Sequence, residues 1–414
     1  MSPNNTQTTK TILKNGLRLI IKPNKSNPSV SFKIAILGGL LVEDEKNNGI
    51  TNFISQTWTR GTKKYSNEEL CLQIESMASM IYGFSSQNSI SLTGQSLSRN
   101  FLKTLKLAVE ILKNPTFENK EIEKVRPMIL EEINRELDNP IKKSFDLFSE
   151  ILFKNHPYAL NQLGKIKNIK NFNQKILQEK YFSLLDPKQI VITIVGDVKL
   201  KETIEFLEAN LSDLNSKNKQ KIVNFSPNFN AKSQKKLLKI EKNQSNIVLG
   251  FEGLAMDDPN IYSLEILKKV LAGMGGRLFI NLRDKQSLAY SLTALQKSGF
   301  KCPGFFATYI GCAPEKADHA VEELRRELKE IREKGITDKE LNDAKNFLTG
   351  VFAVNFQSNS AQANKLCSDE LYGLGYDFDN NYEEKINKVT KKEVLKIARK
   401  IIDLNREVLV IVGP

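Results

Sequence analysis

The residue types that most often hold a catalytic metal are scarce in this sequence. Its 414 residues include only two histidines, His156 and His319, which lie far apart in the chain. The cysteines are Cys71, Cys302, Cys312 and Cys367, and none of them forms a C-x-x-C pair. Cys302 and Cys312 could suit a hairpin disulfide, but their spacing matches no metal site, and we expect four reduced, partly buried thiols. The chain therefore carries no histidine-ligated catalytic metal site of its own.

The composition is that of a soluble globular protein, with 40% hydrophobic and 26% charged residues. The net charge of +13 could indicate an anionic partner, but the lysines are scattered and no aromatic residues are interleaved with them. We therefore interpret the charge as a solvated surface and expect no nucleic-acid partner. The N-terminal residues resemble no signal sequence, and no apolar stretch is long enough for a membrane span. A cytoplasmic protein with no membrane partner is the expectation.

Strand and helix patterns succeed one another along the first half. Short apolar runs at residues 17–21 (LRLII) and 30–37 (VSFKIAIL) adjoin glycine turns and predict strands. Helical periodicity begins at Asn67, where an N-cap is followed by an acidic first turn. A strand-like run at 89–92 precedes a predicted helix at 101–112. A long helix is then expected over 119–137, because Asn139-Pro140 would stop it.

Part of this pattern occurs twice. Residues 169–196 and 386–413 align without a gap: in each segment a polar cap opens a helix, an aspartate follows, and an apolar strand ends in Val-Gly. A second pair of similar segments, at 117–122 and 336–341, has nearly the same offset and opens a long amphipathic helix in each half. Two matches at nearly one offset indicate duplication of a module much larger than a solenoid repeat.

The duplication predicts two homologous domains, at residues 1–212 and 233–414. The segment between them, 213–232, is rich in Lys, Asn and Ser, has no sustained period and is interpreted as a linker. Runs of strands followed by helices, with hairpin-like signals, favour antiparallel sheets backed by helices. We therefore expect an α+β fold in which each domain is a mostly antiparallel β-sheet backed by α-helices.

A glycine-framed segment near the N-terminus gives the first functional indication. Its sequence, GITNFISQTWTRGT at residues 49–62, resembles the active-site helix of the pitrilysin/insulinase family, the inverzincins. That helix reads G-hydrophobic-x-H-F-x-E-H and is followed by G-T. The residues that match this frame are Gly49, Phe53, Gly61 and Thr62. The H-x-x-E-H positions themselves hold Asn52, Ser55 and Gln56.

These three substitutions remove the chemistry that the resemblance implies. Two imidazoles four residues apart lie on one helix face and share a zinc ion, with the glutamate between them as general base. Asn52 and Gln56 keep the spacing, but carboxamides are weak zinc ligands, and Ser55 cannot activate a water molecule. The family's third ligand is a glutamate on a later helix, and the resemblance places it at Glu132, beside Glu131. We expect degenerate metal-site positions here, with no metal and no catalytic residue in this chain.

A second block that resembles the family lies in the C-terminal half. Residues 273–291 (GMGGRLFINLRDKQSLAYS) are similar to the family's glycine-rich turn and the R-L-F-x-x-L-R-x-x-x-x-L-A-Y-S sequence that follows it. The resemblance implies that Arg283 and Tyr290 reach over a zinc site. There, guanidinium and phenol donors hold substrate carbonyls and stabilise a tetrahedral oxyanion. A surface ion pair for Arg283 and a core position for Tyr290 are the alternative interpretation.

The two histidines fit this resemblance without acting as ligands. His156 lies in an H-P-Y segment like that of the family, which is followed shortly by a glycine, here Gly164. We expect a structural, hydrogen-bonded role for His156. His319 falls in a predicted helix at 315–331, where a surface position is expected.

The resemblance covers nearly the whole chain and implies a non-catalytic subunit, similar to the partner subunit of heterodimeric bacterial processing-peptidase-like proteins. In this hypothesis a catalytic paralogue with an intact H-x-x-E-H carries the zinc. The present chain binds no cofactor and supplies Arg283 and Tyr290 in trans during peptide hydrolysis. The main alternative is a structural scaffold of the same fold with no role in proteolysis. A nucleic-acid-binding protein, a peptidase with an unconventional metal site and a homodimeric enzyme are further alternatives.

Overall fold

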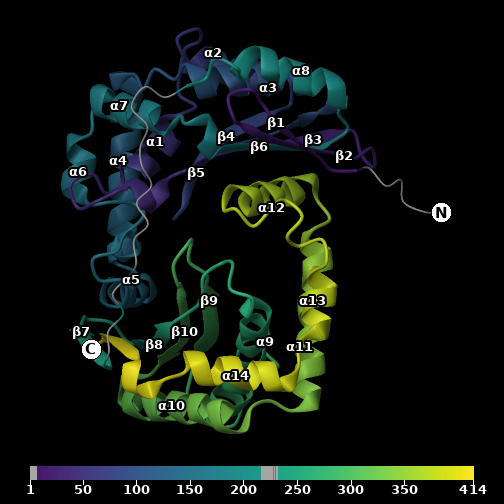
Figure 1. The fold of residues 1–414 in the computed structure, drawn as a ribbon. Helices are drawn as coiled ribbons and strands as arrows, with labels where there is room; N and C mark the ends of the chain where they lie inside the picture. Colours follow the sequence, from purple (N-terminus) through teal and green to yellow (C-terminus); the bar gives the residue numbers. More distant parts are fainter. Residues whose placement is uncertain (1–6, 216–226, 228, 230–231) are drawn as a thin grey trace. The chain divides into compact units, whose positions relative to one another are not determined.

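The structure, a computed structural model, describes residues 7–215, 227, 229 and 232–414 (Figure 1). The chain forms two compact units, each with one β-sheet and its own hydrophobic core. Unit 1 comprises Met1–Ile133, Asn161–Val223 and Asn355–Asp379. Unit 2 comprises Asn134–Leu160, Asn224–Val354 and Asn380–Pro414. The linker expected at 213–232 falls largely outside the described residues.

Unit 1 is built on a six-stranded sheet. Its strands are β1 (Thr9–Ile12), β2 (Arg18–Pro23), β3 (Ser29–Leu37), β4 (Met80–Ser85), β5 (Ser89–Leu97) and β6 (Ile190–Gly196). They lie in the order β1-β2-β6-β3-β5-β4, and only β2 and β6 pair in parallel. The central β6, with the sequence IVITIVG, is buried along its whole length because both of its faces are covered.

Most helices of unit 1 contribute to the core on one face of this sheet. They are α1 (Ile50–Thr57), α2 (Asn67–Ser76), α3 (Phe101–Lys113), α4 (Asn119–Leu137), α6 (Ile166–Asn171), α7 (Gln174–Leu184) and α8 (Leu200–Leu211). The helices predicted at 101–112 and 119–137 are confirmed as α3 and α4. Phe101, Leu105 and Ala108 are buried at helical spacing on α3, which explains why this segment packs on the sheet.

Unit 2 repeats this plan with five strands. They are β7 (Gln234–Lys239), β8 (Ser245–Glu252), β9 (Ser291–Lys297), β10 (Phe305–Cys312) and β11 (Val408–Gly413). The order is β7-β11-β8-β10-β9, and only β7 and β11 pair in parallel. Its helices are α5 (Pro140–Leu152), α9 (Ile261–Leu271), α10 (Ala317–Lys334), α11 (Asp338–Asn355), α13 (Tyr382–Lys388) and α14 (Lys391–Ile401). The expected α+β fold with two mostly antiparallel sheets is therefore confirmed.

The compact units differ from a contiguous division at 1–212 and 233–414, because two helices are exchanged between the halves of the sequence. Helix α5 belongs to the first half but packs on β11 and β8 of unit 2. Helix α12 (Asn359–Leu371) belongs to the second half but packs on β3 and β6 of unit 1. Each helix has 13 residues and follows the long helix of its own half, α4 or α11. Each sequence half therefore completes the sheet of the other.

Helix α12 is held on the first sheet by apolar contacts and by one buried carboxylate. Its residues Ala363, Leu366 and Cys367 pack against the sheet. Near its C-terminal end, Glu370 is only 4% exposed and forms ion pairs with Lys10 of β1 (2.7 Å) and Arg18 of β2 (3.4 Å). If a buried carboxylate loses its charge, its cationic partners are left unpaired. The ion pairs of Glu370 therefore contribute more to stability than an exposed ion pair does.

We predict that Glu370→Gln lowers the midpoint of thermal unfolding, with a loss of stability of about 1–3 kcal/mol, because both cations lose their charged partner. The matched control is Glu384→Gln, which breaks the exposed pair between Glu384 and Lys388 on α13. The control should leave the midpoint almost unchanged. Differential scanning calorimetry compares the two variants, and equal midpoints would contradict the role given to Glu370.

Candidate functional site

The glycine-framed helix α1 begins where two backbone segments touch. Gly49 has a φ of 96°, and a Cβ atom at this position would lie 2.6 Å from the Cα of Gly164. Only glycine fits both the conformation and the contact. The Gly164 that follows the H-P-Y segment is therefore the packing partner of the glycine that opens the degenerate motif. The frame of the motif is required by the fold of unit 1.

The start of α1 is fixed by the carboxylate of Glu43, which is 5% exposed. Its oxygens accept hydrogen bonds from the backbone N–H groups of Gly49 (2.8 Å) and Thr51 (2.9 Å). The side chains of Asn48 (2.9 Å) and Thr51 (2.6 Å) donate to it as well. Burial raises the pKa of Glu43, and these hydrogen bonds act in the opposite direction. Glu43 thus satisfies free donors at the helix N-terminus and has a structural role.

The three former motif positions lie on a well-packed helix. Asn52 is 7% exposed and Ser55 is 2% exposed, whereas Gln56 is exposed. The amide nitrogen of Asn52 is buried without a hydrogen-bond partner, and the hydroxyl of Ser55 donates to the carbonyl of Asn52 (2.8 Å). Glu132, the position expected for the third ligand, lies half-buried on α4. No hydrogen bond or ion pair among the described residues joins it to α1. Asn52, Ser55 and Gln56 thus lie on α1, and Glu132 lies on α4.

These side chains do not fit a zinc ion. Two carboxamides supply no imidazole or anionic ligand, and a hydroxyl bonded to its own helix backbone cannot act as a general base. Among the described residues, no group of three or more His, Cys, Asp or Glu side chains could hold a metal.

The histidines take no part in a metal site either. His156 is buried, its Nδ1 accepts the N–H of Tyr158 (3.1 Å), and its Nε2 lies 3.7 Å from Sγ of Cys302. The structural role expected for His156 is therefore confirmed. His319 is exposed on α10, as expected.

The four cysteines are all free thiols, with Cys71 exposed and the other three buried. Cys302 and Cys312 form no disulfide in the structure. Burial raises the pKa of Cys302 and that of Cys312 to about 11. Burial of this kind disfavours the thiolate, which is the form in which a cysteine acts as a nucleophile.

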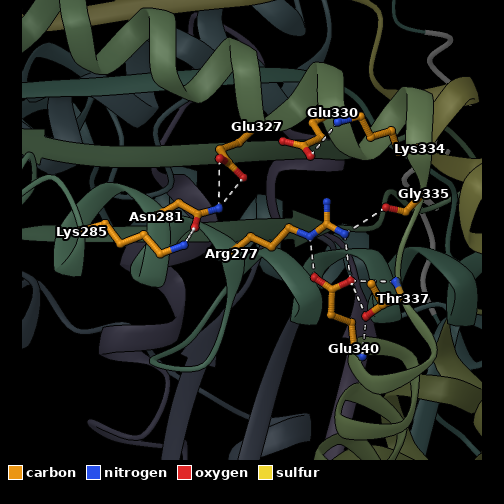
Figure 2. A network of polar contacts seen from close by, with 9 residues as sticks. All are labelled: Arg277, Asn281, Lys285, Glu327, Glu330, Lys334, Gly335, Thr337 and Glu340. Atoms are coloured by element: carbon orange, nitrogen blue, oxygen red, sulfur yellow. Dashed lines mark hydrogen bonds and ion pairs between the residues drawn. The ribbon is translucent and has the colours of Figure 1, made fainter.

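The second family-like block begins with a charged anchor. After the turn at residues 273–276, the guanidinium of Arg277 donates to both carboxylate oxygens of Glu340 (2.5 and 2.8 Å) and to the carbonyl of Gly335 (3.0 Å), as Figure 2 shows. Glu340 also accepts the N–H of Thr337 (2.8 Å), so the same carboxylate caps α11. This bidentate ion pair ties the start of the block to α11.

The block continues with a helical turn that contacts α10. Phe279–Asp284 forms a π-helical turn, and the amide of Asn281 donates to both oxygens of the buried Glu327 (3.0 Å each; Figure 2). Leu282 and Leu288 are buried on either side of a tight loop. Turns of the π type are rare and occur often at functional sites. The loop is thus fixed by the packing of Leu282 and Leu288 and by the hydrogen bonds between Asn281 and Glu327.

Arg283 and Tyr290 line one cavity of about 410 Å³ in unit 2. Tyr290 is 71% exposed, and the guanidinium of Arg283 lies over the ring of Phe279, 4.6 Å from its centre. The backbone N–H of Tyr290 donates to the carbonyl of Gly311 (2.9 Å), which fixes the residue beside β10. The structure therefore brings together the two residues that the sequence singled out, and neither forms an ion pair within the described part of the chain.

The same cavity contains a cation that the sequence patterns did not single out. Lys316 lines it, and its ammonium donates to the carbonyl of Ser287 (2.9 Å). Lys316 lies more than twenty positions after the block, within the helix predicted at 315–331. It directly precedes Ala317, the first residue of α10. No spacing rule connects the two segments, so only the fold could reveal their proximity.

Comparison with known proteins assigns the fold and the family. Residues 18–165 match the family described as Insulinase (Peptidase family M16), and residues 171–348 match the Peptidase M16 inactive domain. The chain belongs to peptidase family M16. Because its H-x-x-E-H positions hold Asn52, Ser55 and Gln56, it is an inactive member of that family. The resemblance inferred from the motifs is confirmed.

Relatives share this sequence along most of its length. The M16 chain is 26% identical over 390 residues, 94% of each chain, to a Bacillus subtilis protein named uncharacterized zinc protease YmxG. It is 25% identical to a Helicobacter pylori protein named non-peptidase homolog YmxG, covering 94% of this chain and 89% of that one. It is also 25% identical to the mouse mitochondrial-processing peptidase subunit beta, covering 83% and 71%.

Solved structures show the same fold. A Pseudomonas fluorescens structure described as a peptidase M16 inactive domain superposes with a TM-score of 0.91 at 20% identity, covering 99% of this chain and 98% of that chain. A Helicobacter pylori structure described as a protease gives 0.91 at 20% identity, covering 99% and 100%. Separately, none of the helices described in this M16 chain is both long and apolar enough to span a membrane.

We predict that the triple variant Asn52→His, Ser55→Glu, Gln56→His binds about one zinc ion per chain, because it rebuilds the family motif on a helix that has kept its frame. Adding Glu132→Gln to this variant should weaken zinc binding at least about tenfold, because a carboxylate ligand is removed. Zinc titration with a competing chelator measures both affinities. Equal affinities with and without Glu132 would contradict its place as the third ligand position.

Proposed function

We propose that this chain is the non-catalytic subunit of a heterodimeric zinc metallopeptidase of family M16. Its partner is a catalytic paralogue with an intact H-x-x-E-H motif, which carries the zinc ion. The present chain contributes Arg283 and Tyr290 to the binding of a peptide substrate. The cytoplasm is the location that we propose for this assembly.

One observation carries the proposal: the ligand positions are degenerate, whereas the Arg283–Tyr290 cavity is intact. Leu282 and Leu288 anchor the loop, Arg277 fixes its start, and the two polar side chains face solvent in one cavity. A surface ion pair for Arg283 and a core position for Tyr290 were the alternatives. The exposure of Tyr290 and the absence of a carboxylate within ion-pair distance of Arg283 in the described residues disfavour both.

The chemistry of this pair suits a peptide carbonyl. A guanidinium and a phenol are hydrogen-bond donors, and a carbonyl oxygen that becomes an oxyanion accepts such bonds more strongly as its charge develops. The zinc ion and the attacking water belong, in this proposal, to the partner chain. Arg283 and Tyr290 orient the peptide and stabilise negative charge, which requires no ionisable base in this subunit.

The edge of the first sheet supports peptide binding by a different feature. Strand β4 is the last strand of its sheet and pairs with β5 alone among the described strands. Its side chains Met80, Tyr82 and Phe84 are 55%, 50% and 55% exposed, and the strand (MIYGFS) contains no charge. Natural sheets usually protect such an edge with lysine or proline, as β7 (QKKLLK) does. An uncharged edge is suited to an extended peptide that adds as a further strand.

We predict that Arg283→Ala and Tyr290→Phe lower the kcat of the natively co-purified assembly. The loss of one oxyanion donor typically reduces kcat about 100–1,000-fold, and Tyr290→Phe should fall at the low end or below this range because the ring remains. The matched control is Arg135→Ala, which removes an exposed guanidinium on α4 that does not line the cavity. Steady-state kinetics with a fluorogenic peptide gives kcat and KM for each variant.

The alternative function is a scaffold of the same fold without a role in proteolysis. It predicts that Arg283→Ala, Tyr290→Phe and Arg135→Ala all leave kcat and KM at their original values. Unchanged turnover in the first two variants, with the assembly still intact by gel filtration, would therefore overturn the proposed role of the pair in trans.

A further inference from the structure

The Arg283–Tyr290 cavity contains a second cation whose position depends on an unusual backbone conformation. Ser287 has a φ of 48°, a left-handed value that is uncommon for a residue other than glycine. Its N–H donates to the carbonyl of Arg283 (2.9 Å), and its own carbonyl accepts the ammonium of Lys316 (2.9 Å). This one residue therefore links the backbone of Arg283 to the ammonium of Lys316. Backbone strain of this kind occurs frequently at ligand-binding sites.

Lys316 lies at a position where local stability does not favour a positive charge. It is the N-cap of α10, and its side chain forms no capping hydrogen bond. The positive end of a helix dipole repels a cation in the first turn, where an acidic residue is favoured. The turn at Pro314–Lys316 and the contact with Ser287 nevertheless direct this ammonium to the cavity.

The two cations of the cavity form no ion pair within the described chain. Neither Arg283 nor Lys316 forms an ion pair with a described carboxylate, although Asp284 also lines the cavity. The ammonium of Lys316 donates one N–H group to Ser287, and its other N–H groups remain available to a ligand. The N–H groups of the Arg283 guanidinium are available as well. The cavity has a volume of about 410 Å³, and it presents the N–H donors of these two cations and the hydroxyl of Tyr290 to a ligand.

We propose that Lys316 is a specificity-determining residue of this cavity and that it binds a carboxylate of the peptide. The carboxylate belongs to an acidic side chain or to the peptide's C-terminus, because both present the same pair of anionic oxygens. Lys316 alone is assigned to this carboxylate, while Arg283 and Tyr290 remain available to a carbonyl oxygen. The inference rests on the proposed function, since it names the substrate class of the same site.

The test uses the full chain and four fluorescein-labelled, alanine-based peptides. One contains an aspartate and has an amidated C-terminus, and its match has asparagine instead. A third contains no acidic side chain but has a free C-terminal carboxylate, and its match is amidated. Fluorescence anisotropy gives the Kd of each peptide. The Asp–Asn pair reports a side-chain carboxylate, and the acid–amide pair reports a C-terminal one.

In the wild-type chain, we expect the carboxylate member of at least one pair to bind more tightly, and raised salt to reduce this difference. Lys316→Ala should weaken that peptide about tenfold, because a hydrogen bond between charged groups is lost, and its neutral match less than about twofold. Lys316→Arg keeps the charge and should retain most of the affinity. The control is Lys285→Ala, which removes an ammonium that bonds Asn281 outside this cavity and should change neither peptide.

Three results would overturn the inference. The first is equal weakening of the carboxylate and neutral peptides by Lys316→Ala, and the second is a loss in Lys316→Arg as large as in Lys316→Ala. The third is the absence of binding of every carboxylate peptide to the wild-type chain at millimolar concentration. Because these measurements need no turnover, they separate the two proposals. If Arg283→Ala lowers kcat but Lys316→Ala changes no preference, the proposed function stands without this specificity.

Discussion

The backbone contact between Gly49 and Gly164 is the constraint on which the N-terminal unit depends. It sets the start of α1 against the segment that follows the buried His156, and Glu43 then satisfies the N-terminal donors of the helix. On the other side, a Cβ at Gly83 of β4 would lie 2.2 Å from the carbonyl oxygen of Ser55. Glycine is thus required on two sides of one short helix.

This constraint explains why the motif has lost its ligands but kept its frame. Gly49 and Phe53 hold α1 in the core, and Gly61 has a φ of 139° at a bridge to Ser66. Thr62 accepts two backbone N–H groups and completes the turn. Replacement of these residues would disturb packing in unit 1, whereas the side chains at positions 52, 55 and 56 take no part in these frame contacts. The residues of the frame are therefore required by the fold of unit 1, whereas the metal ligands of the family motif are required only by its chemistry.

The exchange of α5 and α12 makes the two halves of the duplicated sequence depend on each other. Each sheet obtains the helix on its second face from the other half, and Glu370 pairs α12 with strands at the start of the chain. The repeated segments at 169–196 and 386–413 predicted the duplication, but they could not predict the exchange. Helical periodicity indicates that a face is apolar and says nothing of which sheet covers that face.

The same distinction separates what the sequence predicted in the site from what it did not. The absence of imidazoles at positions 52 and 56 follows from residue identity alone, and the ordered block of residues 273–291 predicted that Arg283 and Tyr290 act together. Lys316 could not be found this way, because its place in the cavity depends on the conformation of Ser287 and on a turn far along the chain. The anchoring pair of Arg277 and Glu340 was missed for the same reason, since it joins two helices distant in sequence.

We propose that this M16 chain cannot hydrolyse a peptide without a partner that supplies the metal. The most direct test is the zinc content and peptidase activity of the full chain purified alone in zinc-containing buffer. The account predicts far less than about one zinc ion per chain and no hydrolysis that a chelator abolishes. Close to one tightly bound zinc ion per chain, together with chelator-sensitive hydrolysis by the chain alone, would contradict it.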